Sequence, residues 1–251
     1  MALMPTNQSG NPTLKNAFRG APRPMLATER MTLSGTINKS FLMLAALLIA
    51  ALYPWSAFFG GEVAVAQSSM LVGMLGGFIL AMVLTFKAQW APFLALPYAA
   101  LQGLALGGLS AVFERRYPGI AIQSVALTFA VFAVMLLAFR AGLIRATERF
   151  RAIVIGATGA IALVYLVSLV LGLFHVEMPL INAATPLGIG ISLVIVAVAA
   201  MNLILDFDLI ESGAASGAPR YMEWYASFAL LVTLVWLYIE MLRLLSKARR
   251  S

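Results

Sequence analysis

Long apolar stretches alternate with short charged segments along most of the chain. Six stretches without Asp, Glu, Lys or Arg contain 22 to 28 residues, and a seventh contains 16. A helix needs about 20 residues to cross a hydrocarbon core of about 30 Å, because each residue adds about 1.5 Å. The pattern therefore predicts seven transmembrane helices, over residues 40–59, 66–86, 92–113, 120–139, 151–174, 187–209 and 221–245.

The last apolar stretch is short, but its flanks are typical of a transmembrane helix. Trp224 and Tyr225 lie at one end, and Trp236 and Tyr238 lie at the other. Aromatic side chains of this kind gather at both membrane interfaces, so the span is predicted to extend over 221–245.

Composition agrees with an integral membrane protein. Hydrophobic residues make up 62% of the 251 residues, charged residues make up 11%, and the mean hydropathy is +0.94. A soluble domain has about 25% charged residues. The expected fold is therefore an all-α bundle of seven transmembrane helices in the lipid bilayer, and soluble enzymes and nucleic-acid-binding modules are excluded.

The predicted transmembrane domain, residues 40–245, lies between two basic tails. Residues 1–39 are rich in Pro, Asn, Ser, Gly and Thr, which predicts a flexible tail, and residues 246–251 form a short C-terminal tail. A cleavable secretory signal would place a short apolar region near the start, whereas the first apolar run begins only at Phe41 and is long enough to span. We expect no cleavage.

Basic residues favour a cytoplasmic N-terminus, because this orientation puts most Lys and Arg side chains on the cytoplasmic side. The C-terminal residues Arg243, Lys247, Arg249 and Arg250 would then lie outside. Two alternatives follow: the seventh helix carries its basic end across the membrane, or one segment is re-entrant and both termini are cytoplasmic.

The chain contains no cysteine and one histidine, His175, so thiol catalysis and His/Cys zinc sites are excluded. His175 and the neighbouring Glu177 are interpreted as solvated loop residues. Neither a nucleophile motif nor a phosphate-binding motif is present, and no cofactor is expected. The protein is not expected to be an enzyme.

The acidic residues concentrate in the last two predicted helices and their connection. The connection, 211–220, contains two glycines and a proline, which predicts a hairpin with its midpoint near residues 214 and 215. Asp206 and Glu223 each lie about eight residues from that midpoint, so the two carboxyl groups should be level and face each other. The five acidic residues in this region are Asp206, Asp208, Glu211, Glu223 and Glu240.

Two carboxyl groups within hydrogen-bonding reach in a poorly solvated site share one proton. When both are ionised, they repel each other and attract a hard cation such as Ca²⁺, which takes oxygen ligands. The pair Asp206 and Glu223 is therefore predicted to be a pH sensor and cation gate that closes on protonation, and Ca²⁺ is the expected bound or transported ion.

Five further residues are secondary candidates. Asn202 shares a helix face with Asp206 and would extend its polar network, whereas Asp208 is interpreted as ending the sixth helix at the water interface. Glu240 lies about 25 Å along the helix from Glu223, so it is predicted to pair with Arg243 or to line the far mouth of a pathway. The remaining two are Gln102, expected to make an interhelical hydrogen bond or to line a pore, and Arg220, at the start of the last helix.

Pairs of glycines at close-packing spacing lie in the second and third predicted helices. These are Gly73 with Gly77, and Gly103 with Gly107. Such pairs allow two helix backbones to approach closely. Ordinary packing inside the bundle is the simpler interpretation, and a dimer interface is the alternative.

Several segments together resemble the Bax-inhibitor family of membrane proteins, in its bacterial branch. The similarity extends from about residue 31 to the end of the chain. It rests on LDFD at 205–208 and on the segments MTLSGTINKSF, YAALQGLALGGLSAVFERRYPG, FRAGLIRATERFR and YMEWYASFALLVTLVWLYIEMLRLL.

The resemblance implies a fold in which the last helix is central and an acidic pair from the sixth and seventh helices senses pH. It also implies pH-dependent Ca²⁺ leak, and a bacterial inner-membrane location. The acidic residue of the sixth helix corresponds to Asp206. Relatives have an aspartate inside the seventh helix, where this chain offers Glu223 and Glu240, and many have glutamate where this chain has Gln102.

The leading hypothesis is a pH-sensitive Ca²⁺ leak channel. The alternative is an interaction protein without transport activity, which regulates a membrane protease or a stress or cell-death pathway through helix contacts and the basic tail. An intramembrane hydrolase lacks support, because no Gly-flanked catalytic motif and no second intramembrane aspartate occur in the seventh helix.

Overall fold

The computed structural model describes residues 30–174 and 184–250, and this part of the chain contains seven long helices and one short 3-10 turn. All seven helices are long and apolar enough to cross a membrane, which confirms the predicted all-α transmembrane bundle. The N-terminal tail up to residue 29, His175 and Glu177 lie outside the described residues. The elements are α2 (Leu33–Phe59), α3 (Val63–Phe86), η2 (Ala88–Trp90), α4 (Ala91–Arg116), α5 (Ile120–Arg140), α6 (Glu148–Leu173), α8 (Pro186–Ala215) and α9 (Tyr221–Ala248).

Two helix ends differ from the sequence prediction in ways that matter for the site. α2 begins at Leu33 rather than at residue 40, because the Thr32 side chain caps it by accepting a hydrogen bond from the Gly35 amide. α8 continues to Ala215 rather than ending near 209, with Gly213 buried inside the helix. The turn follows at Gly217, whose φ of 67° suits a residue without a Cβ.

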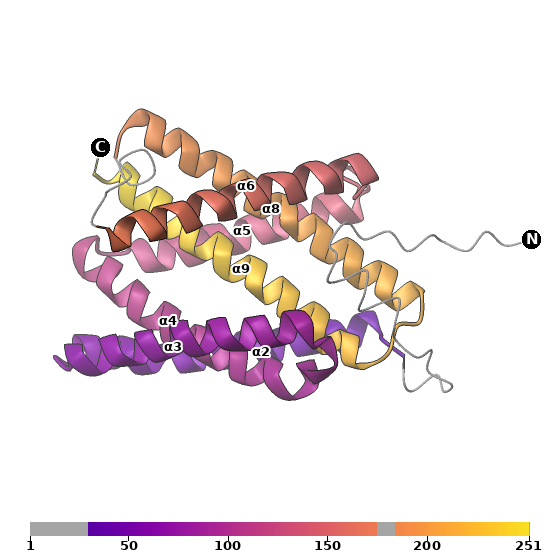
Figure 1. Ribbon diagram of the computed structural model, residues 1–251, viewed down its shortest axis with the longest axis horizontal. Helices are drawn as coiled ribbons and strands as arrows, with labels where there is room; N and C mark the ends of the chain where they lie inside the picture. The colour runs from indigo at the N-terminus through magenta and orange to yellow at the C-terminus, as the bar shows by residue number, and fades with distance from the viewer. Residues whose placement is uncertain (1–29, 175–183, 251) are drawn as a thin grey trace, which may run out of the picture.

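Helix α9 occupies the centre of the bundle, as Figure 1 shows. It packs against α2, α4, α5 and α8. In its most apolar stretch 56% of the residues are buried, compared with 6% for α6. The helices therefore form two groups around α9, with α2, α3 and α4 on one side and α5, α6 and α8 on the other (Figure 1).

The glycine pairs lie where helices of the first group make close contact. A Cβ on Gly73 would collide with the backbone of α4, and a Cβ on Gly103 or Gly107 would collide with the backbone carbonyls of Leu47 or Ala51 in α2. The backbones can approach this closely only because these positions are glycine. The packing interpretation of the glycine pairs is therefore confirmed.

The two described ends of the chain lie at opposite ends of the bundle. Near the start, the Met31 amide donates a 2.7 Å hydrogen bond to the Ala218 carbonyl in the α8–α9 turn. At the other end, Arg249 donates 2.8 Å hydrogen bonds to the Pro118 carbonyl and to Gln123, next to the α4–α5 turn. The structure thus has the arrangement in which the last helix carries its basic end across the bundle.

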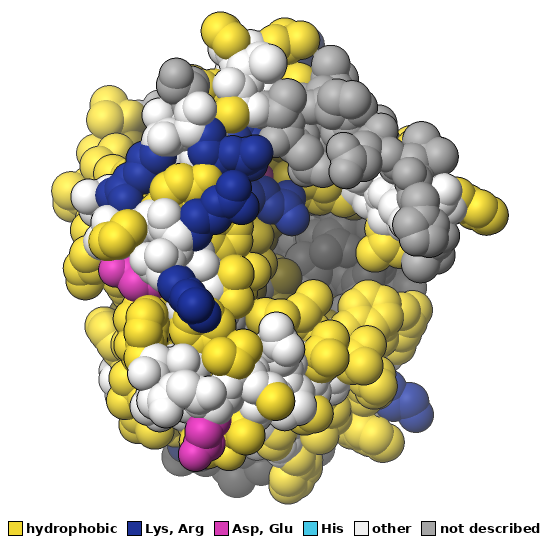
Figure 2. Space-filling view, turned by 90° about the vertical axis from the view of Figure 1, so that its left-hand side faces the viewer, with side chains coloured by type: hydrophobic (Ala, Val, Ile, Leu, Met, Phe, Trp, Pro, Cys, Tyr) yellow, Lys and Arg dark blue, Asp and Glu magenta, His cyan; other side chains and the backbone are white. Residues whose placement is uncertain are grey.

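Basic side chains gather at the end of the bundle that contains the C-terminal end of α9 (Figure 2). The exposed ones are Arg115, Arg116, Arg249 and Arg250. Basic residues also flank the helices at the opposite end of the bundle; these are Lys39, Lys87, Arg140 and Arg151.

Candidate functional site

Asp206 is a carboxylic acid inside the membrane-spanning part of α8. It lies about 8 Å from the midpoint of the helix, at about 1.5 Å per residue. Its side chain faces the Thr233 hydroxyl of α9, which donates a 3.3 Å hydrogen bond to the Ala229 carbonyl of its own helix. Its second oxygen, Oδ2, is buried and has no hydrogen-bond partner among the described residues. The α8–α9 contact thus contains an ionisable group that is incompletely satisfied, which is costly in a low-dielectric interior.

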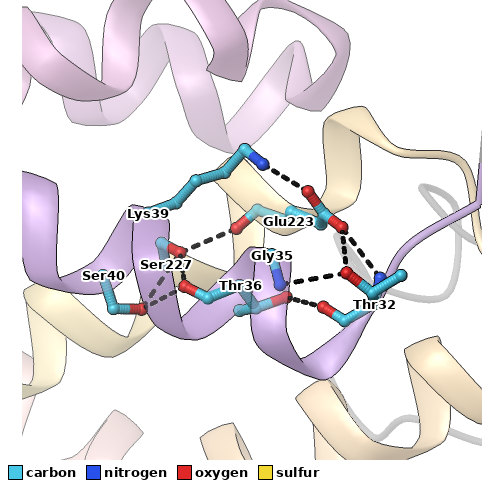
Figure 3. A network of polar contacts seen from close by, with 7 residues as sticks. All are labelled: Thr32, Gly35, Thr36, Lys39, Ser40, Glu223 and Ser227. Carbon is cyan, nitrogen blue, oxygen red and sulfur yellow. Dashed lines mark hydrogen bonds and ion pairs between the residues drawn. The ribbon is translucent and has the colours of Figure 1, made fainter.

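Glu223 lies in the first turn of α9 and is 2% exposed. One of its oxygens, Oε1, accepts hydrogen bonds from the Thr32 amide at 2.8 Å and from the Thr32 hydroxyl at 2.9 Å. The other oxygen, Oε2, forms an ion pair with Lys39 of α2. Figure 3 shows both oxygens of Glu223 turned toward α2 and the residue that caps it.

The predicted pair of Asp206 and Glu223 is not formed. The hairpin midpoint lies nearer to the end of the bundle than expected, because α8 continues to Ala215. Asp206 is consequently opposite Thr233, ten residues beyond Glu223 and about 15 Å farther along α9. The two carboxyl groups belong to different environments, and each has its own partners.

A polar network surrounds Glu223 and joins the start of α2 to the start of α9 (Figure 3). Ser227 donates to the Thr36 carbonyl at 3.0 Å, and Ser40 donates to Ser227 at 3.0 Å. Gly35 lies directly below the Glu223 carboxylate, so that a Cβ at this position would overlap with it. The small residues of α2 therefore let the buried carboxylate approach the helix.

The prediction that Asp208 ends its helix is wrong, because α8 continues for two further turns beyond it. It points toward α6, where Arg151 donates a 2.5 Å hydrogen bond to its Oδ2. Arg151 also lies 3.6 Å from the carboxylate of Glu148. Asp208 is thus half of an ion pair between α6 and α8 at one end of the bundle.

Asn202 faces α6 through its amide, one turn from Asp206. The amide donates to the Thr158 hydroxyl of α6 at 2.8 Å and to the Val198 carbonyl of its own helix at 2.9 Å. Asn202 therefore joins α8 to α6, and the predicted extension of the Asp206 network through Asn202 is not among the hydrogen bonds of the described residues.

Glu240 is 1% exposed, although it lies near the end of the last helix. The predicted ion pair with Arg243 is present, at 3.3 Å. The Tyr165 hydroxyl of α6 also donates to Glu240, at 2.7 Å, and the Arg243 guanidinium lies over the Tyr165 ring, 4.9 Å from its centroid. Glu240 is therefore a buried contact between α9 and α6.

The two remaining candidates lie apart from these carboxylates. Gln102 interacts with Tyr98 of its own helix and fills the space above Gly77 of α3. Arg220 is exposed and immediately precedes α9. Gln102 therefore contributes to packing between α3 and α4, away from Asp206.

Apart from Arg243, the partners of the carboxylates were not predicted from the sequence. Lys39 was assigned to the flexible tail, and Thr32 was not considered. The partners on α6 carried a signal in the sequence: Arg151, Thr158 and Tyr165 follow one another at intervals of seven, and the residues between them are apolar or glycine. Residues at this interval lie on one helix face.

The described residues contain no cluster of three or more His, Cys, Asp or Glu side chains that could hold a metal ion.

Comparison with protein-family models matches residues 7–250 of the chain to the family described as Bax inhibitor 1 like. No curated protein and no solved structure matches the chain.

Proposed function

We propose that this chain, which belongs to the Bax inhibitor 1 like family, is a pH-sensitive leak channel for Ca²⁺. The multi-pass transmembrane bundle is its frame. The proposed gate is the contact between Asp206 on α8 and Thr233 on α9. The proposed gate thus consists of one carboxyl group and one hydroxyl, and not of the two carboxyl groups expected from the sequence.

The observation that supports this proposal is the unpartnered Oδ2 of Asp206. Ionisable residues inside membrane spans are rare, because a charge is costly there, and they mark ion and proton pathways. A protonated Asp206 is neutral and can remain between α8 and α9. An ionised Asp206 requires water or a cation as compensation.

The proposed direction of gating follows from this difference. At low pH the neutral carboxyl hydrogen-bonds to Thr233 and holds α8 against α9. At higher pH the ionised carboxylate favours separation of the helices and hydration of the contact. Its oxygens then offer the kind of ligand that Ca²⁺ prefers.

Glu223 has a different role in this proposal. Its carboxylate is already compensated by Lys39 and Thr32. We infer that it fastens α9 to α2 at one end of the bundle, while Asp206 responds to pH.

The proposed location is a bacterial inner membrane, with the start of α2 on the cytoplasmic side. The basic residues at this end support the orientation, since cytoplasmic loops carry an excess of Lys and Arg. They include Arg30, Lys39, Lys87, Arg140, Arg145, Arg149, Arg151 and Arg220.

The test is Ca²⁺ flux into liposomes that contain the purified protein, recorded from about pH 6 to about pH 8. This range includes neutral pH, where carboxyl groups in apolar sites can titrate. Wild-type flux should rise with pH. Asp206→Asn, which cannot ionise, should keep flux low at every pH. Glu211→Gln removes an exposed carboxylate from the same helix and should behave as wild type.

An unchanged pH response in Asp206→Asn would reject the gate. Absence of wild-type flux at every pH, from protein shown to be folded, would reject the channel itself and leave the interaction protein as the remaining hypothesis.

A further inference from the structure

We propose that the cation path runs along the contact between α6 and the α8–α9 pair, and that α6 closes this path by occupying its oxygen atoms. The inference rests on the proposed leak function and assigns a route to the ion. It is carried by three polar contacts of α6, by their spacing, and by the weak packing of α6 elsewhere.

The three contacts of α6 connect it to oxygen-bearing side chains of α8 and α9. Arg151 donates to Asp208 at 2.5 Å. Thr158 accepts from Asn202 at 2.8 Å, and Tyr165 donates to Glu240 at 2.7 Å. Each is a side-chain contact between residues far apart in sequence.

The spacing of these contacts gives them a direction across the membrane. Arg151, Thr158 and Tyr165 are seven residues apart, or almost two full turns, so they lie in one stripe along α6. The stripe extends over about 21 Å at about 1.5 Å per residue, which is most of a hydrocarbon core of about 30 Å. A row of polar contacts therefore runs through the part of the bundle where polar groups are most costly.

The rest of α6 packs weakly. It packs mainly against α8, and Ile153, Leu163, Leu166 and Leu169 are all more than half exposed on its outer face. Among the side chains of α6 that the structure describes, only Val154, which belongs to the inward stripe, is fully buried. Few apolar contacts would be lost if α6 moved away from α8.

An apolar groove separates α6 from α8 beside the Tyr165 contact. Its volume is about 580 Å³, and it is lined by Ile161, Val164 and Tyr165 of α6 and by Leu187, Ile191 and Val194 of α8. The two helices are therefore not closely packed over this length. Beside this groove, the polar contact of α6 is the one from Tyr165 to Glu240 of α9.

The chemistry on the two sides of the contact is unequal. The α8–α9 side supplies the carboxylates of Asp208 and Glu240, whereas α6 supplies the donors of Arg151 and Tyr165. Between them, the Asn202 amide nitrogen donates to the Thr158 hydroxyl. While α6 is in place, its donors satisfy these carboxylates. When α6 moves away, Asp208 loses Arg151, and Glu240 keeps, of its described hydrogen-bond partners, only Arg243 of its own helix. A hard cation is a suitable new partner for these oxygens.

Asp206 is placed to connect the gate with this path. It lies four residues after Asn202, so the two side chains are neighbours on α8. Hydration of an ionised Asp206 would reach the row of oxygens within one helical turn. The path and the gate are thus consecutive parts of one route.

A cross-linking experiment tests this route directly, because the chain contains no cysteine. In Thr158→Cys with Asn202→Cys, a short bifunctional methanethiosulfonate should fix α6 to α8. We expect loss of Ca²⁺ flux on cross-linking and its return after reduction. The matched control is Ser40→Cys with Ser227→Cys, which the same reagent fixes between α2 and α9, where the hydroxyls are 3.0 Å apart.

A second pair of variants tests the path without relying on the cysteines. Tyr165→Phe removes a donor from Glu240 and should increase the leak, because α6 is held less firmly. Tyr238→Phe removes a buried hydroxyl of α9 that is 2.7 Å from Ser110 of α4, away from α6, and should leave the flux unchanged.

The outcomes separate this inference from the proposed function. Wild-type flux that persists after α6 is fixed, together with unaltered flux in Tyr165→Phe, would overturn the α6 path and leave the channel intact. Loss of flux on cross-linking the α2–α9 control would also count against the α6 path, because a cross-link between any two helices would then be enough to stop the flux. If wild-type protein does not conduct, the proposed function fails first.

Discussion

Lys39 and Glu223 form an ion pair although 184 residues separate them in the chain. Lys39 lies in the second turn of α2, and Glu223 in the first turn of α9. The Lys39 ammonium also lies 5.4 Å from the centroid of the Trp224 ring. This contact ties the first described helix to the central one, at the end of the bundle where the chain also makes its α8–α9 turn.

The first prediction concerns this ion pair. Glu223→Gln should lower the free energy of unfolding by about 3 kcal/mol, because the partly buried Lys39 side chain loses its counter-charge. Thermal unfolding in detergent would measure the change. Glu211→Gln, at an exposed position of α8, is the control and should unfold as wild type does. A variant as stable as wild type would show that the pair contributes little.

The same variant separates stability from gating. If Asp206 is the pH-responsive group, Glu223→Gln should retain the pH dependence of Ca²⁺ flux at temperatures where it is folded. Flux recorded across the pH range would check this. If the flux of this variant does not depend on pH, Glu223 is part of the pH sensor. Asp206 and Glu223 would then have to meet in another state of the protein.

The hydroxyl of Thr233 should hold the gate closed. Thr233→Val keeps the shape of the side chain but removes the hydroxyl that faces Asp206, and an unsatisfied buried polar group costs about 1 to 3 kcal/mol. We expect a higher leak at low pH than in wild type. Thr128→Val is the control, because Thr128 is buried in α5 and its hydroxyl bonds to the Ser124 carbonyl of its own helix.

Close packing in the first helix group should depend on glycine. A Cβ on Gly107 would overlap with the backbone of Ala51, which cannot give way as a flexible side chain can. Gly107→Ala should destabilise the bundle by about 1 to 3 kcal/mol, measured by thermal unfolding. Gly159→Ala in α6, where a Cβ meets nothing within 4 Å, should be neutral or slightly stabilising. Equal stability of the two variants would contradict this packing.

The orientation of the bundle can be tested with single cysteines, again because the chain has none of its own. Glu62→Cys, in the α2–α3 turn, lies at the end of the bundle that includes the end of α9. Gly142→Cys, in the α5–α6 connection, lies at the other end. With the proposed orientation, an impermeant thiol reagent applied to intact cells should label only Glu62→Cys. Labelling of Gly142→Cys alone would reverse the orientation.

The sequence predicted the number and approximate limits of the helices. A membrane span must be long, apolar and nearly free of charge, and this requirement is visible residue by residue. The prediction failed at α8, whose end was placed near residue 209, before the first glycine of the connection. Gly213 remains inside the helix, and only Gly217 adopts the left-handed conformation that ends it.

That local difference accounts for the error in the site. Each residue added to a helix moves the following side chain by about 1.5 Å and turns it by about 100°. A hairpin turn displaced by a few residues therefore brings Thr233, and not Glu223, opposite Asp206. Register between two helices depends on such details and could not be obtained from hydropathy.

The sequence by itself determined that this protein lies in the membrane as seven helices with carboxyl groups concentrated in the last two, because lipid tolerates only such long apolar spans. The tertiary structure alone decided which group meets which: Glu223 with Lys39, Asp206 with Thr233, and Glu240 with Tyr165. The physical reason is that these partners come from α2, α6 and α9, which are distant in the chain. Their contacts follow from how the helices pack around α9, and that packing is recorded in no single stretch of sequence.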